Sequence, residues 1–186
     1  MVDSEFKVVA FTGKYCLKVP YSSWYSFFNS PYPGHKYASA LDIYFNHSEA
    51  LLPVDEGRIL EVEKFPCPRY RADASDYDYL ILIQLDSSTV LKILHVEPSV
   101  GCGERVYLGD PLGRMIVSGF FSDWSDLHMH VEVRRASDPY RALGAYPLNI
   151  SSSIKRLSPI SNLSMEFYVD EVKDCLLYTS PSPRDS

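Results

Sequence analysis

The stretch that decides the fold is Tyr79-Leu-Ile-Leu-Ile-Gln-Leu85, which is followed by Asp86-Ser-Ser88 and then by Val90-Leu-Lys-Ile-Leu-His-Val96. The first segment is a continuous apolar run of strand length, and such runs are typical of strands that are buried on both faces. The polar residues between the two segments favour a turn. The sequence therefore predicts two β-strands joined by a tight turn, the first of them fully inside the protein.

Further short segments with strand character lie on both sides of this pair, separated by glycine, proline or polar residues. They lie at residues 6–11, 15–19, 40–45, 50–54, 58–63 and 127–133. The sequence has neither an internal repeat nor an alternation of strands with long helices. Many short strands with frequent turns predict an all-β fold, mainly antiparallel and of the sandwich or barrel type, with few short helices.

Length and composition limit the classes of function. The chain has 186 residues, which favours a single domain. Its formal net charge of -6 argues against a nucleic-acid partner, which selects a basic surface. No apolar run reaches about 18 residues, so no membrane span is predicted. Residues 1–6 lack the basic and apolar regions of a signal peptide, which predicts a cytoplasmic location as written and an extracytoplasmic one if an N-terminal segment is missing.

The cysteines and the end of the chain are interpreted separately. The four cysteines form no CxxC pair and are predicted to be reduced thiols: Cys16, Cys67, Cys102 and Cys175. The final segment, CLLYTSPSPRDS at residues 175–186, changes composition abruptly and resembles a translated sequencing adapter. We therefore expect that it is not native and exclude it from the fold.

Two groups of charged residues are predicted to be solvated surface. The acidic run Asp73-Ala-Ser-Asp-Tyr-Asp78 lacks the glycine and the final glutamate of an EF-hand loop. The pair Arg134-Arg135 stands at the expected end of a strand.

The candidate chemistry begins with the histidines. In Leu127-His-Met-His-Val-Glu-Val133, the two-residue period of a strand places His128 and His130 on one face, with Leu127, Met129 and Val131 on the other. Alternation likewise predicts that His95 shares a face with Leu91 and Ile93. Two adjacent imidazoles suit a metal ligand beside an acid or base, although an H-x-H pattern alone is weak evidence.

Asp42 is the most informative single residue. It lies between Leu41 and Ile43 inside an apolar strand, where a carboxylate costs free energy unless it is paired or bound to a metal. His35 follows Pro33-Gly34 in the loop that leads to this strand. Two histidines and one aspartate, with an open fourth position, are typical of catalytic zinc.

Together these segments resemble the lysostaphin-type (LytM-domain) zinc endopeptidases, from about His35 to Leu148. The stretch SALDIYFNHSEALLPVDEGRILEVEKF at residues 39–65 is similar to the family's GxDxxxxxGxPVxAxxxGxVxxV segment. TVLKILHV, at residues 89–96, resembles its Tyr-x-His-Leu stretch, and GERVYLGDPLGRM, at residues 103–115, resembles its GdxVxxGqxIG hairpin. HMHVEVR, at residues 128–134, stands for HxHFEVR. The resemblance implies the all-β fold of the LytM, or duplicated-hybrid-motif, type.

The first ligand departs from the family pattern. The usual ligand lies four residues before the aspartate, where this chain has Ala38. The H-x6-D spacing from His35 to Asp42 is instead similar to the D-alanyl-D-alanine zinc peptidases, whose pattern is HxxGxAxD. The resemblance implies that Zn²⁺ is held by His35, Asp42 and His130, with no organic cofactor.

The resemblance also implies an activity, that of a zinc metalloendopeptidase. It implies that His95 and His128 are catalytic, flanking the zinc-activated water, and it leaves open which of them takes the proton. A peptide or a peptidoglycan-like cell-wall cross-link is the implied substrate.

The implied organisation is an N-terminal part at 1–34 with two strands and an aromatic loop, a LytM-like zinc peptidase core at 35–150, and a truncated extension at 151–174 before the adapter segment.

Two alternatives to the peptidase remain. One is a catalytically degenerate LytM-like binding or regulatory module, which Ala38 favours and the three histidines at one site oppose. The other is a sugar-phosphotransfer carrier of similar β architecture, with His95 and His128 as phosphate acceptors. Asp42 opposes the carrier because a carboxylate in the site would repel phosphate.

Overall fold

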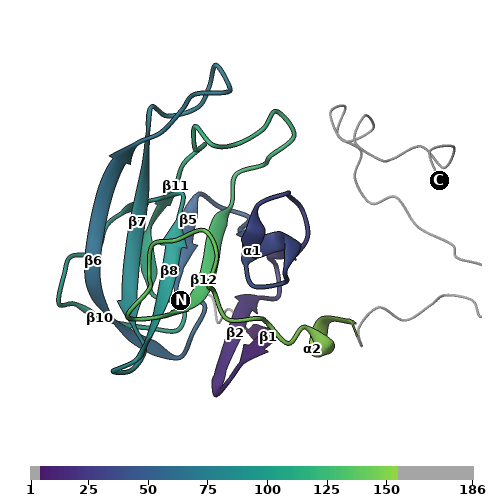
Figure 1. Cartoon of the computed structure of the whole chain (residues 1–186), viewed down its shortest axis with the longest axis vertical. Coiled ribbons are helices and arrows are strands. Elements are labelled where there is room, and N and C mark those ends of the chain that lie inside the picture. The colour runs from purple at the N-terminus through teal and green to yellow at the C-terminus, as the bar shows by residue number, and fades with distance from the viewer. Residues whose placement is uncertain (1–4, 155–186) are drawn as a thin grey trace, which may run out of the picture.

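The computed structural model describes residues 5–154 of the chain (Figure 1). The strands in chain order are β1 Phe6–Thr12, β2 Tyr15–Pro20, β3 Trp24–Ser26, β4 Leu41–Tyr44, β5 Glu49–Leu51, β6 Glu56–Pro66, β7 Tyr77–Gln84, β8 Thr89–Leu94, β9 Val96–Pro98, β10 Arg105–Tyr107, β11 Pro111–Met115 and β12 Met129–Arg135. The helices are α1 Pro33–Lys36 and α2 Ser151–Ile154. The predicted extension beyond residue 154 and the predicted adapter segment, with Cys175, lie outside the described residues.

The prediction of a mainly antiparallel all-β fold is confirmed. Seven strands form a curled sheet in the order β10-β6-β7-β8-β12-β4-β3, and every neighbouring pair is antiparallel. A smaller sheet contains β5-β11-β9, and β1 pairs with β2 in a hairpin. The two helices have four residues each, and neither is long and apolar enough to cross a membrane.

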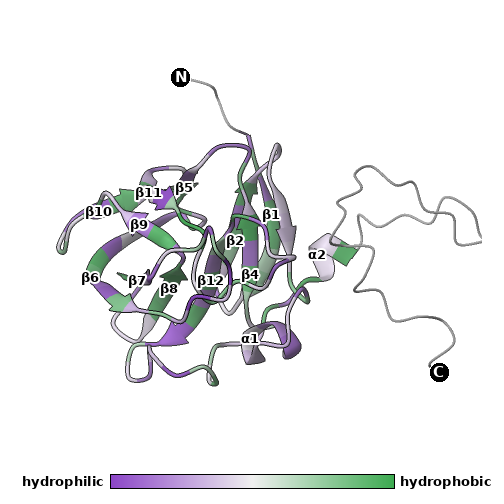
Figure 2. Ribbon diagram, turned by 90° about the horizontal axis from the view of Figure 1, so that it is seen from above, coloured by the Kyte–Doolittle hydropathy of each residue, from purple (hydrophilic) through white to green (hydrophobic). Residues whose placement is uncertain are grey.

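The predicted strand pair at residues 79–96 forms the middle of the large sheet. β7 and β8 pair in the register Leu80 to Leu94 and Ile83 to Leu91. Ile83 and Leu91 are completely buried in a core that the smaller sheet and the β1–β2 hairpin share. Figure 2 shows hydrophobic colour along β7 and β8, while β6 alternates between polar and apolar residues. Burial of apolar area at about 25 cal/mol per Å² is the main favourable term of such a core.

The position of β12 brings the predicted site together. It lies between β8 and β4, with His130 opposite Leu94 on one side and opposite Asp42 on the other. Segments that are 88 residues apart in the sequence therefore lie side by side. Met129 and Val131 are completely buried in the core, so His128 and His130 point to the other face, as the alternation predicts.

Two local features differ from the sequence-based expectation. His35 lies in the short helix α1 rather than in a loop, and Pro33 opens this helix because its fixed φ suits a first helical turn. The strand expected at residues 58–63 extends over the whole of β6, where it pairs with β7 from Arg58 opposite Gln84 to Pro66 opposite Tyr77.

Candidate metal centre

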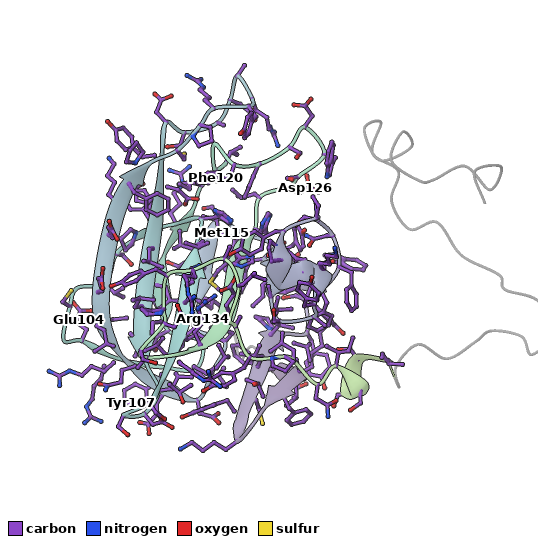
Figure 3. The ribbon with its side chains drawn as sticks, in the orientation of Figure 1. Glu104, Tyr107, Met115, Phe120, Asp126 and Arg134 are labelled. Atoms are coloured by element: carbon purple, nitrogen blue, oxygen red, sulfur yellow. The ribbon has the colours of Figure 1, made fainter. Side chains whose placement is uncertain are left out.

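A cavity of about 1750 Å³ opens on the face of the large sheet that carries the histidines. Its lining includes all five residues predicted from the sequence to form the site: His35, Asp42, His95, His128 and His130. Each of them is less than a tenth exposed. The loop between β11 and β12 supplies one wall, and Figure 3 labels two of its lining residues, Phe120 and Asp126. Ala38 does not line this cavity.

Asp42 stands at the centre of the histidines. Its Oδ1 is 2.8 Å from Nδ1 of His130, and its Oδ2 is 3.2 Å from Nε2 of His35 and 3.4 Å from Nε2 of His128. The side-chain amide of Asn29 also donates to Oδ2, at 2.7 Å. Burial alone would raise the pKa of Asp42, but His128, His130 and His35 hold it well below its usual range. The carboxylate is therefore ionised near neutral pH.

His35 is fixed from its far side. Its Nδ1 lies 3.0 Å from the backbone carbonyl of Phe27, and a carbonyl only accepts hydrogen bonds. Nδ1 therefore carries a proton, and Nε2, which faces Asp42, is the nitrogen that a neutral His35 leaves free for a metal. A metal-ligating histidine usually has such an outer partner, which sets both the tautomer and the ring orientation.

His130 has a corresponding outer partner in Glu132. Nε2 of His130 is 3.1 Å from Glu132 Oε1, and Arg134 donates to Glu132 Oε2 at 2.5 Å. Lys92 lies 3.7 Å from the same oxygen. Burial would lower the pKa of His130, but the hydrogen bonds to Asp42 and Glu132 outweigh it and raise that pKa to about 9. In the same way, burial would raise the pKa of Glu132, but His130, Lys92 and Arg134 lower it to about 2.

His95 reaches the cavity by a route that alternation did not predict. Leu91 and Ile93 are in the core, whereas Lys92 and Leu94 line the cavity. Strict alternation would bury His95 in the core, so the expectation that it shares a face with Leu91 and Ile93 was wrong. His95 follows the last residue of β8 and adopts φ of 69°, a left-handed conformation that turns its side chain to the cavity face.

The ring of His95 is held by Asp78. Nδ1 of His95 lies 2.7 Å from Asp78 Oδ2, which also accepts a hydrogen bond from Ser118 Oγ at 2.7 Å. Asp78 is completely buried, so the prediction that it belongs to a solvated acidic loop was wrong. The rings of His95 and His128 stand nearly perpendicular, with centroids 5.3 Å apart.

Away from Asp42, His128 is held by neutral groups. Its Nδ1 donates to the backbone carbonyl of Asp126 at 2.6 Å, and its ring stacks on Phe121 with centroids 4.3 Å apart and an angle of 12°. Burial lowers the pKa of His128 to about 4, against the opposing effect of Asp42. The imidazole is therefore neutral at neutral pH.

The donor set fits zinc. Ligand atoms of His35, Asp42 and His130 all lie within 4.8 Å of one another. Bonds of about 2.0–2.1 Å in a tetrahedral zinc site place ligand atoms about 3.3 Å apart. The two nitrogen–oxygen distances to Asp42, 2.8 and 3.2 Å, are close to that separation. Two imidazoles and one carboxylate, each with an outer hydrogen-bond partner, are the ligands that zinc takes in catalytic sites.

Sequence reasoning missed the residues that support this site. Asp78 stands before the apolar run of β7, between two tyrosines, and the argument used for Asp42 would have found it. Glu132 lies two residues after His130 and therefore on the same face. Arg134 continues that face and is completely buried, so the prediction of a solvated strand end was wrong for this residue. Asn29 lies in an irregular segment and carries no comparable signal in the sequence.

The family of the chain follows from a comparison with family models. Residues 16–150, nearly three quarters of the chain, match the model described as Domain of unknown function (DUF8155) N-terminal domain. The chain belongs to this family. The match to DUF8155 begins inside β2, continues through β12 and so includes the whole candidate site.

This DUF8155 domain is similar to the solved structures of two proteins. The search of curated proteins found no match. A zinc-containing peptidase from Vibrio cholerae is similar at 18% identity and a TM-score of 0.39, over 59% of this chain and 31% of that one. The chain thus spans about a third of that peptidase. LytU is similar at 15% identity and a TM-score of 0.42, over 84% of this chain and 90% of that one.

Proposed function

We propose that this DUF8155 domain is a zinc-dependent peptidase. The observation that carries the proposal is the convergence of Nε2 of His35 and Nδ1 of His130 on the carboxylate of Asp42. The outer nitrogens of both histidines already have partners, in the Phe27 carbonyl and in Glu132. The inner nitrogens and the carboxylate therefore form a preorganised N₂O donor set for a divalent cation, which would displace the proton on Nδ1 of His130 as it binds.

The chemistry of this proposal divides between the metal and the chain. Bound zinc would act as a Lewis acid on the scissile carbonyl and lower the pKa of water from about 15.7 to about 7. His95 and His128 line the same cavity. The ring centroid of His95 lies 6.0 Å from that of His130 and 5.3 Å from that of His128. An imidazole there can take the proton of the attacking water or donate a hydrogen bond to the developing oxyanion.

The cavity supports a peptide as the substrate. Its volume of about 1750 Å³ exceeds the roughly 300–1,000 Å³ of a pocket for a small molecule. About a third of the lining residues are Phe, Tyr or Trp, and four of these side chains are largely exposed: Trp24, Phe120, Trp124 and Tyr140. Such surfaces pack against the apolar parts of an extended chain and exclude water from the reacting bond. Among peptides, we propose a peptide cross-link of the cell wall as the specific substrate.

Zinc content of the purified full chain tests the proposal first. We expect about one zinc per chain by mass spectrometry of the metal, with loss of zinc in His35→Ala and in His130→Ala. His47→Ala is the matched control, because His47 is exposed and does not line the cavity. Retention of zinc in His35→Ala would show that the first ligand is wrong.

Activity is tested next on the zinc-loaded protein. Cleavage of unlabelled peptides and of cross-linked cell-wall peptides is followed by mass spectrometry, with His130→Ala as the inactive comparison. A parent protein without zinc would contradict the enzyme and favour a degenerate binding module. A parent that holds zinc but cleaves no peptide would contradict the peptidase while leaving the metal site in place.

A further inference from the structure

We infer that Asp78 is a positioning residue that fixes His95 in one tautomer and makes His95, rather than His128, the proton acceptor of the site. The assignment of a proton acceptor rests on the proposed peptidase function. The assignment of the tautomer rests only on the contacts of Asp78 and His95, and it is testable without any activity.

Asp78 receives four hydrogen bonds although it has no exposed surface. Its Oδ1 accepts from the backbone N–H of Tyr79 at 2.7 Å and from that of His95 at 3.1 Å. Its Oδ2 accepts from the hydroxyl of Ser118 and from Nδ1 of His95, both at 2.7 Å. Each carboxylate oxygen thus has two donors, which offset the cost of burying the charge.

These contacts determine the tautomer of His95. An ionised carboxylate only accepts hydrogen bonds, so Nδ1 of His95 must carry a proton, and in the neutral ring Nε2 then presents the lone pair. Burial would raise the pKa of Asp78, but His95 and Ser118 lower it, which keeps the carboxylate ionised. Within residues 5–154, Nε2 of His95 has no hydrogen-bond partner, and the ring lines the cavity. Nε2 is therefore the free end of the imidazole.

Asp78 also holds the backbone that aims this ring. His95 is one of two residues other than glycine with a positive φ in the described part of the chain, at 69°. Such a conformation costs free energy and persists only where surrounding contacts determine it. Here one carboxylate binds both the backbone N–H and the ring of the same histidine, so it fixes conformation and tautomer together.

The comparison with His128 separates the roles of the two histidines. A carboxylate facing Nδ1 stabilises the imidazolium that forms when Nε2 takes a proton, whereas a backbone carbonyl does so less. Nδ1 of His95 faces the carboxylate of Asp78, whereas Nδ1 of His128 faces the backbone carbonyl of Asp126. The carboxylate nearest to His128 is Asp42, 3.4 Å from its Nε2, and it belongs to the proposed metal ligands. As the water oxygen bonds to the scissile carbonyl carbon, Nε2 of His95 takes one water proton. It returns that proton to the leaving nitrogen as the carbon–nitrogen bond breaks.

Asp78→Asn gives a sharp test, because the backbone N–H groups of Tyr79 and His95 only donate hydrogen bonds and so fix which way the new amide faces. The amide oxygen must face Tyr79 and His95 N–H, which turns the NH₂ group toward Nδ1 of His95. Nδ1 must then accept, so the proton moves to Nε2 and the free lone pair is lost. We expect nitrogen-15 NMR of histidine-labelled full chain to show Nδ1–H at His95 in the parent and Nε2–H in Asp78→Asn. We expect kcat to fall about 10²–10⁴-fold, with KM within twofold and zinc content unchanged.

Asp86→Asn is the matched control. Asp86 also accepts side-chain and backbone hydrogen bonds, but it lies at the β7–β8 turn and does not line the cavity. Its replacement should leave the tautomer of His95 and kcat unchanged. An Nε2–H tautomer in the parent overturns the inference even if Asp78→Asn fails to fold. A tautomer switch with an unchanged kcat overturns the role of His95. A switch in a protein that cleaves no peptide supports the positioning and refutes the proposed function.

Discussion

Replacing Arg134 by methionine should be among the most destabilising single changes in the strands around the site. Arg134 is completely buried and donates to Glu132 at 2.5 Å and to the backbone carbonyls of Asp138 and Leu143 at 3.0 and 2.7 Å. Figure 3 shows it in the middle of the molecule. Hydrogen bonds that involve a charged group contribute about 1.5–3 kcal/mol each. Methionine recovers part of this loss because its buried side chain contributes roughly 1.5–3 kcal/mol.

The net loss expected for Arg134→Met is about 3–5 kcal/mol, the range found when one partner of a buried ion pair is removed. Glu132 would keep Lys92 at 3.7 Å and His130 at 3.1 Å, which prevents a larger loss. The measurement is urea unfolding of the zinc-loaded full chain at pH 7, followed by tryptophan fluorescence and circular dichroism. Since domains are stable by only about 5–15 kcal/mol, such a loss is easily resolved.

Arg141→Met provides the matched control for this measurement. Arg141 makes a bidentate pair with Asp138, at 2.9 and 2.7 Å, but its side chain is mostly exposed. An exposed ion pair is worth about 0–1 kcal/mol, so little change in stability is expected. If Arg134→Met costs less than about 1 kcal/mol, or no more than Arg141→Met, the buried network does not stabilise the strand that carries His130, and the reasoning fails.

Three further predictions follow from particular contacts. Folding lowers the pKa of the Asp78 carboxyl. The ionised Asp78 therefore stabilises the folded protein above its unfolded pKa of about 3.9, and this stabilisation is lost as the pH falls further. The urea midpoint should therefore fall less steeply below pH 4 in Asp78→Asn than in the parent. Gly113→Ala should cost more than about 3 kcal/mol, because its φ is 149° and a Cβ atom would lie 2.1 Å from the carbonyl oxygen of Glu97. Gly13→Ala, with φ of 55° and open space, should cost only about 1–2 kcal/mol in the same unfolding assay. Removing zinc with a chelator should lower the free energy of unfolding by about 4 kcal/mol, compared with protein at a free zinc concentration 1,000 times Kd. Thermal unfolding with and without chelator measures this difference. An unchanged unfolding midpoint would contradict a metal in the folded protein.

The sequence predicts the parts of this structure that depend on local pattern. The apolar run at residues 79–85 and the alternation at residues 127–133 predict β7 and the face of β12 because side-chain direction in a regular strand follows from residue number alone. The roles of His35, Asp42 and His130 as zinc ligands remain predictions. Their proximity depends on the pairing of β4 with β12, which joins segments 88 residues apart.

The failures occur where the backbone leaves the regular strand or where a charge has a distant partner. A left-handed residue at His95 reverses the direction that alternation assigns, and no pattern in the surrounding sequence marks that residue. Asp78 and Arg134 were assigned to solvent because charged residues are rarely buried without a partner. Their partners, Ser118 and Leu143 among them, lie outside the local sequence window. Burial of Arg134 is therefore predictable only after the fold is known, whereas Asp42 and Asp78 are marked by the apolar strands in which they lie.

The two buried aspartates of the site differ in a way that bears on the metal. Asp78 has four donors for its two oxygens, and its hydrogen-bonding capacity is fully used without any ligand. Asp42 lies among three histidines, with Nδ1 of His130 and Nε2 of His35 and of His128 within 3.4 Å of its oxygens. Its ligand atoms and those of His35 and His130 lie close enough together to hold one metal ion. Asp78 contacts a single histidine, and this difference is why we assign the metal to the first aspartate and the orientation of His95 to the second.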